Sequence, residues 1–151
     1  MDSQLIEFLS GPVLMIIGTC DASGTPGIAR GVGARVEAEA LDTIRVFFSN
    51  SHWPHIAAHL GDGGLAAATF SRPADYMTYQ IKGRASVFDC DEADYAAISE
   101  YSRRVDEALS LPAIDPAQVA IWMDIANPRT LRLEVAEVFV QTPGPRAGVR
   151  L

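Results

Sequence analysis

The sequence predicts a mainly β domain: a mostly antiparallel barrel of six strands with flanking helices. Six short segments rich in branched and aromatic residues are separated by turn sequences. Too few helical segments lie between them to build parallel βαβ units. The chain has 151 residues, 48% of them hydrophobic, which is enough for one core. No repeat or linker divides it, so residues 1–151 are predicted to form a single domain.

The N-terminal third is predicted to hold a short helix and three strands. Ser3 is the expected cap of the helix. The branched apolar run Val13–Cys20 stops at the turn sequence DASG, and a second strand starts at Pro26. These two strands should form a hairpin. A third strand is expected at Ile44–Ser49.

The remaining elements follow from the same apolar periodicity and from turn and cap residues. They are a helix at Pro54–Leu60, strands at Leu65–Phe70 and Tyr76–Phe88, the main helix at Asp91–Leu109, a short helix at Ala117–Met123 and a final strand at Leu131–Thr142.

The fifth predicted strand has one polar face. Its period of two residues places Thr78, Gln80, Lys82 and Arg84 on the same side. We expect this side to line a binding site or a subunit contact. On the opposite side, Gly83 is expected where another backbone approaches closely.

The charge balance argues against a nucleic-acid partner. The net charge is −7, whereas non-specific nucleic-acid binding depends on many Lys and Arg contacts to phosphates. Of the 12 basic residues only Lys82 is a lysine, and none precedes Arg30. A local group of arginines would still suit a phosphorylated ligand, because the guanidinium binds phosphate oxygens bidentately.

The sequence also predicts the cellular location of the protein and argues against several classes of enzyme. No basic region precedes an apolar run, and the longest such run, Val13–Ile17, is too short to cross a membrane. We therefore expect a cytoplasmic protein with no membrane partner and with free thiols at Cys20 and Cys90. No Walker loop, nucleophile elbow or HExxH motif is present.

Three segments carry arginines, glycines, one lysine and small hydroxyls: Pro26–Arg35, Phe47–His55 and Tyr79–Ala85. With the order of elements over Gly11–Phe88 and the tail Gln141–Gly148, they resemble the FMN-binding split-barrel family, the pyridoxamine 5′-phosphate oxidase-like proteins. The resemblance implies an FMN cofactor, a two-fold homodimer with flavin between the subunits, and an oxidoreductase acting on a small molecule. The fold it implies is a six-stranded antiparallel split barrel.

The family's motifs map onto individual residues of this chain. Two basic residues five positions apart on the second strand, which contact the FMN phosphate and ring edge in the family, correspond to Arg30 and Arg35. Strand period places these two on opposite faces, so either a bulge at Gly31 or Gly33 re-aims one of them or the two serve different subunits. The residues predicted to bind the cofactor are Arg30, Gly31, Val32, Gly33, Arg35, Ser49, Asn50, Trp53, His55, Thr78, Gln80 and Lys82.

Two departures from the family's motifs leave a second interpretation of the function open. A Ser-Arg-Lys-like triplet of the family aligns with Trp53, Pro54 and His55, which supply less positive charge. The basic C-terminal substrate clamp of the true oxidase has no match, since Arg129 and Arg132 are arranged differently. Oxidation of pyridoxamine phosphate is therefore not expected, and no catalytic residue is assigned. A non-catalytic dimer that binds haem or another ligand is the alternative.

Histidines and tryptophans have two interpretations each. His52, His55 and His59 lie within eight residues, and the last two have the i, i+4 spacing of metal ligands on a helix. A metal or haem site there is the less favoured interpretation. Trp53 and Trp122 can stack on a flavin ring, but packing in the core or a dimer is the commoner use of large aromatics.

Overall fold

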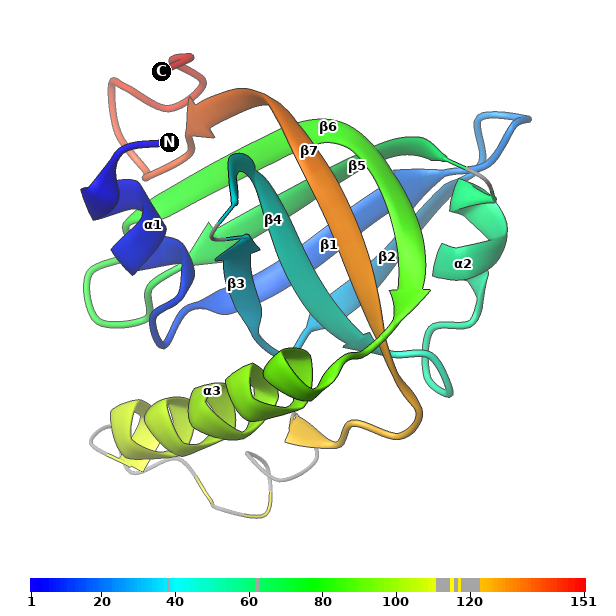
Figure 1. Cartoon of the computed structure of the whole chain (residues 1–151). Helices are drawn as coiled ribbons and strands as arrows, with labels where there is room; N and C mark the ends of the chain where they lie inside the picture. The colour runs from blue at the N-terminus through cyan, green and yellow to red at the C-terminus, as the bar shows by residue number, and fades with distance from the viewer. Residues whose placement is uncertain (38, 62, 111–114, 116, 118–122) are drawn as a thin grey trace.

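The structure is a computed structural model that describes residues 1–37, 39–61, 63–110, 115, 117 and 123–151 (Figure 1). Its elements in chain order are α1 (Ser3–Leu9), β1 (Leu14–Cys20), β2 (Pro26–Gly31), β3 (Ala34–Glu37), β4 (Ala40–Ser49), α2 (His55–Leu60), β5 (Gly64–Ser71), β6 (Thr78–Asp89), α3 (Glu92–Ser110) and β7 (Pro128–Val140). The predicted helix at Ala117–Met123 and Trp122 lie almost wholly outside the described residues.

The strands form one antiparallel sheet that curls into a barrel (Figure 1). Its strand order is β2-β1-β5-β6-β7-β4-β3. The two ends of the sheet meet beyond β2, where the Val32 N–H donates to the Phe47 carbonyl and the Phe47 N–H donates to the Gly33 carbonyl, at 2.8 and 2.9 Å. The predicted mainly β antiparallel barrel is confirmed.

The strand count differs from the prediction because the second predicted strand is two strands. β2 pairs with β1, whereas β3 pairs with β4. Between them Gly33 has a φ of 127°, a conformation that side-chain-bearing residues rarely adopt. The chain therefore changes direction at Gly33, and the barrel has seven strands in the part of the chain that the structure describes.

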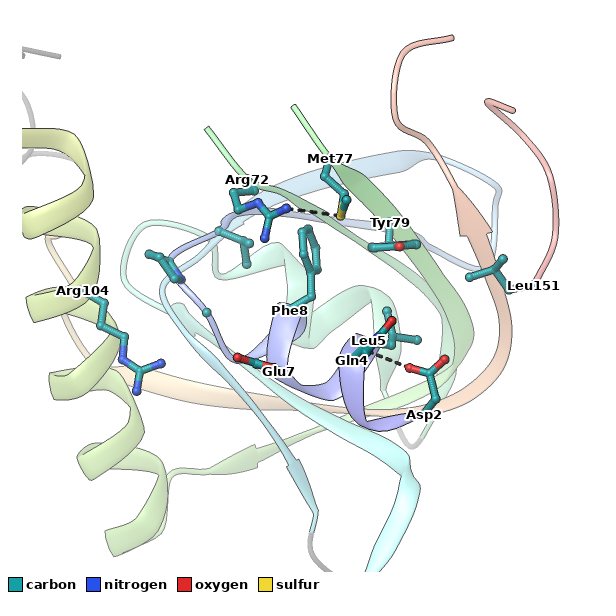
Figure 2. Close-up of a pocket in the computed structure, with 13 residues that line it drawn as sticks. Asp2, Gln4, Leu5, Glu7, Phe8, Arg72, Met77, Tyr79, Arg104 and Leu151 are labelled. Atoms are coloured by element: carbon teal, nitrogen blue, oxygen red, sulfur yellow. Dashed lines mark hydrogen bonds between the residues drawn. The ribbon is translucent and has the colours of Figure 1, made fainter. Parts of the chain in front are cut away.

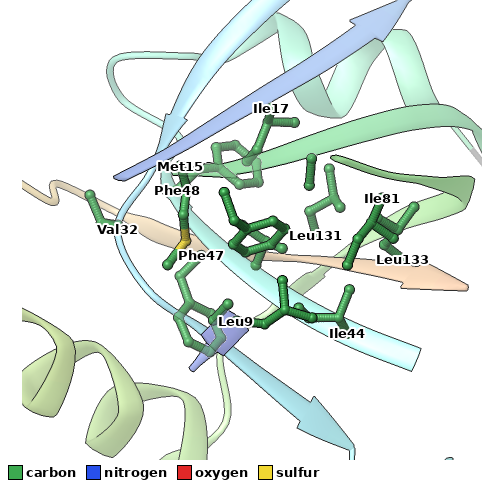
Figure 3. Close-up of a cluster of buried hydrophobic side chains, with 14 of the residues drawn as sticks. Leu9, Met15, Ile17, Val32, Ile44, Phe47, Phe48, Ile81, Leu131 and Leu133 are labelled. Carbon is green, nitrogen blue, oxygen red and sulfur yellow. The ribbon is translucent and has the colours of Figure 1, made fainter. Parts of the chain in front are cut away.

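The core fills the barrel with large apolar side chains. Phe47, Phe48, Phe70 and Leu131 are fully buried, and Leu9 of α1 joins them from one end (Figure 3). The cap of α1 is Asp2 rather than the predicted Ser3, because Asp2 Oδ1 accepts from the Leu5 N–H at 2.8 Å.

The helices cover the ends of the barrel rather than crossing between its strands. α3 lies below β3 and β4, and α1 lies beside β3 (Figure 1). Of the helices that the structure describes, none combines the length and the apolar character of a membrane span.

Candidate functional site

A pocket of about 360 Å³ lies between the outer side of β2 and the loop that follows β4. Its wall is mostly apolar, with one arginine, one histidine and one aspartate. The lining residues are Ile16, Ile28, Ala29, Arg30, Val32, Ser49, His52, Trp53 and Asp124. We call this cavity the Arg30 pocket.

The pairing of β1 with β2 places the apolar side chains of one pocket wall on the same side of the sheet. Arg30 of β2 lies directly opposite Ile16 of β1, so both side chains emerge on the same side of the sheet. Ile28, two residues earlier on β2, emerges on that side as well. Ile16 and Ile28 are 46% and 62% exposed, although residues of this type are usually buried. They give the pocket a solvent-facing apolar surface.

Hydrogen bonds fix the loop that forms the opposite part of the pocket. The buried Ser49 Oγ donates to the Ala126 carbonyl at 2.7 Å. The Asn50 N–H donates to the Asn127 carbonyl at 3.1 Å, and the Trp53 N–H donates to the Ser49 carbonyl at 3.0 Å. These bonds tie the loop after β4 to the segment before β7. Trp53 is thereby held in the pocket wall.

The same hydrogen bonds between the loop after β4 and the segment before β7 bring His52 and Asp124 together at the pocket. His52 Nε2 lies 3.4 Å from Asp124 Oδ2, and the His52 side chain is 44% exposed. The two residues are far apart in sequence, so only the fold shows them to be a pair. Sequence reasoning considered His52 only with His55 and His59, for a metal or haem site, and did not identify Asp124, Ile16 or Ile28.

Arg35 lies elsewhere, in an ion network that joins β3 to the start of α3. Its Nε donates to Asp94 Oδ1 at 2.8 Å, and its Nη2 lies 3.1 Å from Asp91 Oδ2. The turn at Gly33 separates it from Arg30, and Arg35 does not line the Arg30 pocket. The two arginines expected to contact the FMN phosphate and ring edge are therefore divided between two parts of the barrel.

The Asp94 carboxylate is the centre of that network. Its side chain is fully buried and accepts hydrogen bonds from Arg45, Thr130 and Arg35. Burial by itself raises the pKa of a carboxyl group. The hydrogen bonds from these three residues outweigh burial, and the pKa of Asp94 is lowered from its usual value. The network is built to hold an ionised carboxylate.

Backbone groups between Gly31 and Gly33 form hydrogen bonds that close the barrel. Val32 N–H and the Gly33 carbonyl are paired with Phe47, as described above, so these two groups are not available to a ligand. A Cβ at Gly31 would lie 2.7 Å from the Met15 Cβ. The glycine is therefore explained by packing against β1. Of these three residues, only Val32 lines the pocket.

The predicted polar residues of β6 lie outside the Arg30 pocket. Gln80 Nε2 donates to Thr69 Oγ1 at 3.0 Å, and the Lys82 ammonium lies 4.8 Å from the centre of the Phe139 ring. Thr78 is buried, and its hydroxyl donates to the Tyr76 carbonyl. β6 is separated from β2 by β1 and β5, so these side chains and Arg30 are not brought together within one chain.

His55 and His59 hold α2 against the β1–β2 hairpin. His55 Nε2 bonds the Ile28 carbonyl at 3.1 Å, and His59 Nδ1 bonds Thr19 Oγ1 at 3.0 Å. A Cβ on Gly27 would come within 2.7 Å of both imidazole rings. Within the described ranges no group of three or more His, Cys, Asp or Glu side chains is placed to hold a metal. The structure thus gives these two histidines a packing role.

A second cavity, of about 450 Å³, lies at the opposite end of the barrel beside α1 (Figure 2). Arg72 in its wall lies over the Phe8 ring and makes a two-point ion pair with Asp75. Glu7 and Asp2 also line it. Because the Arg72 charge is matched by Asp75 and acidic groups lie nearby, the wall of this cavity does not favour an anionic ligand.

Comparison with known proteins identifies the fold. No protein-family model and no curated protein matches the chain. HupZ from Group A Streptococcus is similar in structure, with a TM-score of 0.60 and 17% identity over 98% of this chain and 100% of that one. A proposed pyridoxamine 5′-phosphate oxidase from Lactobacillus delbrueckii has a TM-score of 0.56 and 12% identity, over 93% of each chain. An F420 reductase has a TM-score of 0.53 and 14% identity, over 87% of this chain and 93% of that one. At these identities the likeness shows the fold, which is the split barrel of the pyridoxamine 5′-phosphate oxidase-like proteins.

Proposed function

We propose that this split-barrel chain binds FMN in the Arg30 pocket and acts as an oxidoreductase on a small molecule. The observation that carries the proposal is the pocket itself, which combines an arginine with a flat apolar and aromatic wall. The names of two structural neighbours denote redox enzymes, which supports the proposal at the level of the fold.

The chemistry of the pocket fits a phosphorylated aromatic ring. Arg30 provides a charged fork for phosphate oxygens. Ile16, Ile28 and the Trp53 indole provide apolar surface for a planar ring. When bound, the flavin would supply the redox chemistry, while the chain binds it, orients it and shields it from water. Ser49 lines the same pocket, but its hydroxyl proton is used by the Ala126 carbonyl, so it can serve a ligand only as an acceptor.

The arginines near the C-terminus do not form a substrate clamp at this site. Arg129 donates to the Phe88 carbonyl and lies 3.3 Å from an Asp89 carboxylate oxygen. Arg132 is paired with Glu37 and Glu134. Neither residue lines the Arg30 pocket, so the substrate that we propose is not pyridoxamine phosphate.

We also propose that two chains associate through the outer face of β2, β1, β5 and β6. This face presents the exposed side chains of Ile28 and Leu65, the latter 65% exposed, around the small residues Gly18 and Ala67. A shallow groove of about 450 Å³ runs over it and shares Ile28 with the Arg30 pocket. A second copy on this face would cover the apolar surface and bring Lys82 of the partner subunit toward an Arg30 pocket.

Placing a charge on this face is expected to separate the dimer. Leu65→Arg should give a monomer at micromolar concentration in sedimentation velocity, because it buries an unpaired cation in the contact. Tyr95→Arg is the control, since Tyr95 is also exposed but lies on α3, away from the face. A wild-type protein that sediments as a monomer would remove the basis of the dimer.

Arg30→Ala is expected to weaken FMN binding by about 10- to 100-fold. This follows from the loss of charge-assisted hydrogen bonds worth about 1.5–3 kcal/mol. Flavin fluorescence titration measures the change. Arg103→Ala serves as the matched control, because Arg103 is an exposed arginine on α3, outside the pocket and away from the proposed dimer face. Equal affinities in wild type and Arg30→Ala would exclude Arg30 as a phosphate ligand.

Haem binding without catalysis is the second candidate, and one observation favours it. The imidazole of His52 is accessible in the wall of an apolar pocket, and a histidine is the commonest protein ligand of haem iron. If the chain is titrated with haem, a Soret shift that disappears in His52→Ala would support this candidate. FMN uptake with no haem-specific shift would reject it.

A further inference from the structure

We propose that a small polar pocket on the outer side of β6 and β7 binds the phosphate group of a small molecule. The pocket has a volume of about 230 Å³. We call it the Arg84 pocket, and its wall includes Gly63, Arg84, Ser86, Phe88, Arg132 and Glu134. None of the described residues that line it also lines the Arg30 pocket, so the inference does not depend on the proposed function.

The pairing of β6 with β7 gathers the polar side chains of this pocket. Arg84 lies directly opposite Glu134, and Ser86 lies directly opposite Arg132. Alternate residues of a strand point to the same side, so Arg84 and Ser86 share one side of β6. Ala85, between them, is buried in the core, which places the other two on the outer side. Two arginines and a hydroxyl group therefore meet on this surface.

The residue before β5 leaves space for a ligand between Arg84 and Ser86. An ideal Cβ at Gly63 would lie 3.5 Å from Ser86 Oγ and 3.7 Å from Arg84 Nη2. Both polar groups therefore lie close to one point in the pocket. A side chain at position 63 would fill that point, whereas glycine leaves it open to a ligand oxygen.

The charges of the wall leave one arginine available to an anion. Among the residues that the structure describes, the Arg84 guanidinium and the Ser86 hydroxyl have no hydrogen-bond or ion-pair partner. Arg132 donates from Nε and Nη2 to Glu37 and from Nη1 to Glu134. The negative charge of Glu134 is therefore matched within the wall. Arg84 remains as an unmatched positive charge in a chain whose net charge is −7.

This combination of groups suits a phosphate. The arginine fork can bind two phosphate oxygens, and the serine hydroxyl can donate to a third. Phe88, which is 47% exposed, lies in the same wall and offers an apolar contact to the organic part of a phosphate ester. The volume of about 230 Å³ is below that of the usual site for a drug-sized ligand. It therefore favours a free phosphate ion or a small ester.

The Arg84 pocket lies beside the proposed dimer face. Leu65 of β5, which that face presents, is directly opposite Arg84. The groove on the dimer face and the Arg84 pocket have no lining residue in common in the part of the chain that the structure describes. The two proposals therefore use different residues and can be tested separately.

An NMR titration can locate the bound phosphate. Sodium phosphate is added to isotope-labelled protein at fixed pH and constant ionic strength, so that screening does not change. The amide signals of Gly63, Arg84 and Ser86 should shift together and saturate at millimolar phosphate. Arg84→Gln should weaken this binding about five- to tenfold, as expected for one charge-assisted contact. Glu134→Gln should strengthen it about two- to fivefold, because it removes a negative charge from the wall.

Controls separate this site from other effects of phosphate. Arg103→Gln, at an exposed arginine of α3, should keep the wild-type affinity. Arg30→Ala should keep it as well, because Arg30 lies in the other pocket. Phenyl phosphate distinguishes the two sources of the ligand: tighter binding that is lost in Phe88→Ala would indicate an ester, and affinity equal to that of inorganic phosphate would indicate the free ion.

Two results would overturn the inference. One is the absence of saturable shifts at these three amides, and the other is an unchanged affinity in Arg84→Gln. Either result would leave the proposed binding of FMN in the Arg30 pocket unaffected.

Discussion

Gly83→Ala is expected to destabilise the protein by more than about 4 kcal/mol, which is a large part of the stability of a typical domain. Gly83 lies in β6 where the register with β7 shifts. A Cβ there would overlap the carbonyl oxygen of Glu134 and lie 3.2 Å from the Ala136 nitrogen. Both neighbours are backbone atoms of the paired strand, so they cannot move away without breaking the ladder between β6 and β7.

Urea unfolding of Gly83→Ala and Gly18→Ala tests this expectation. Gly18 also lies inside a strand, but a Cβ at this position would lie 3.9 Å from the Ala67 carbonyl oxygen, which is an ordinary contact. Gly18→Ala should therefore change the unfolding free energy by less than about 1 kcal/mol. Equal unfolding midpoints for the two variants would show that β7 accommodates a side chain at position 83.

Asp94→Ala is expected to destabilise the fold by about 3–5 kcal/mol, the usual cost of removing one partner from a buried ion pair. The substitution removes the buried carboxylate that Arg35 shares with Arg45, whose side chain is 14% exposed, and leaves them only the half-exposed Asp91 as a common partner. Thr130 loses its acceptor as well. Glu107→Ala is the control on the same helix, because its pair with Arg103 is at the surface and should contribute less than about 1 kcal/mol.

The Asp94 network also predicts a dependence of stability on pH. The pKa of Asp94 is lower in the folded protein than its usual value, which is about 3.9 in an unfolded chain. Its stabilising contribution is therefore fully present above about pH 4–5 and is lost as the pH falls through the folded pKa. Urea unfolding at a series of pH values should show a steeper loss of stability below about pH 4 for wild type than for Asp94→Ala. Equal slopes would contradict the network.

Local patterns in the sequence were sufficient for much of the fold. Alternation and turn residues located the β1–β2 hairpin, and the strand containing Gly83 was correctly expected to meet another backbone closely. The break at Gly33 was missed because PGIARGVGAR reads as one continuous strand. The positive φ at Gly33 and its pairing with Phe47 depend on how the barrel closes, which local sequence does not encode.

The residues of the candidate site were harder to predict from local sequence than the strands were. Strand period already placed Arg30 and Arg35 on opposite faces. The ion network that engages Arg35 could not be predicted, because its partners Asp91 and Asp94 lie more than fifty residues away. The contribution of Ile16 follows only from its register opposite Arg30. Contacts between distant segments decide which charged groups are available to a ligand. Sequence reasoning identifies the candidates, and the fold selects among them.

The visible absorption spectrum of the protein after incubation with FMN and gel filtration shows whether the Arg30 pocket holds the flavin. A flavin spectrum should elute with the wild-type protein and with the control Arg103→Ala, and it should be strongly reduced with Arg30→Ala. The contrary result is a folded wild-type protein that elutes without flavin. It would mean that this split barrel does not hold FMN in the Arg30 pocket.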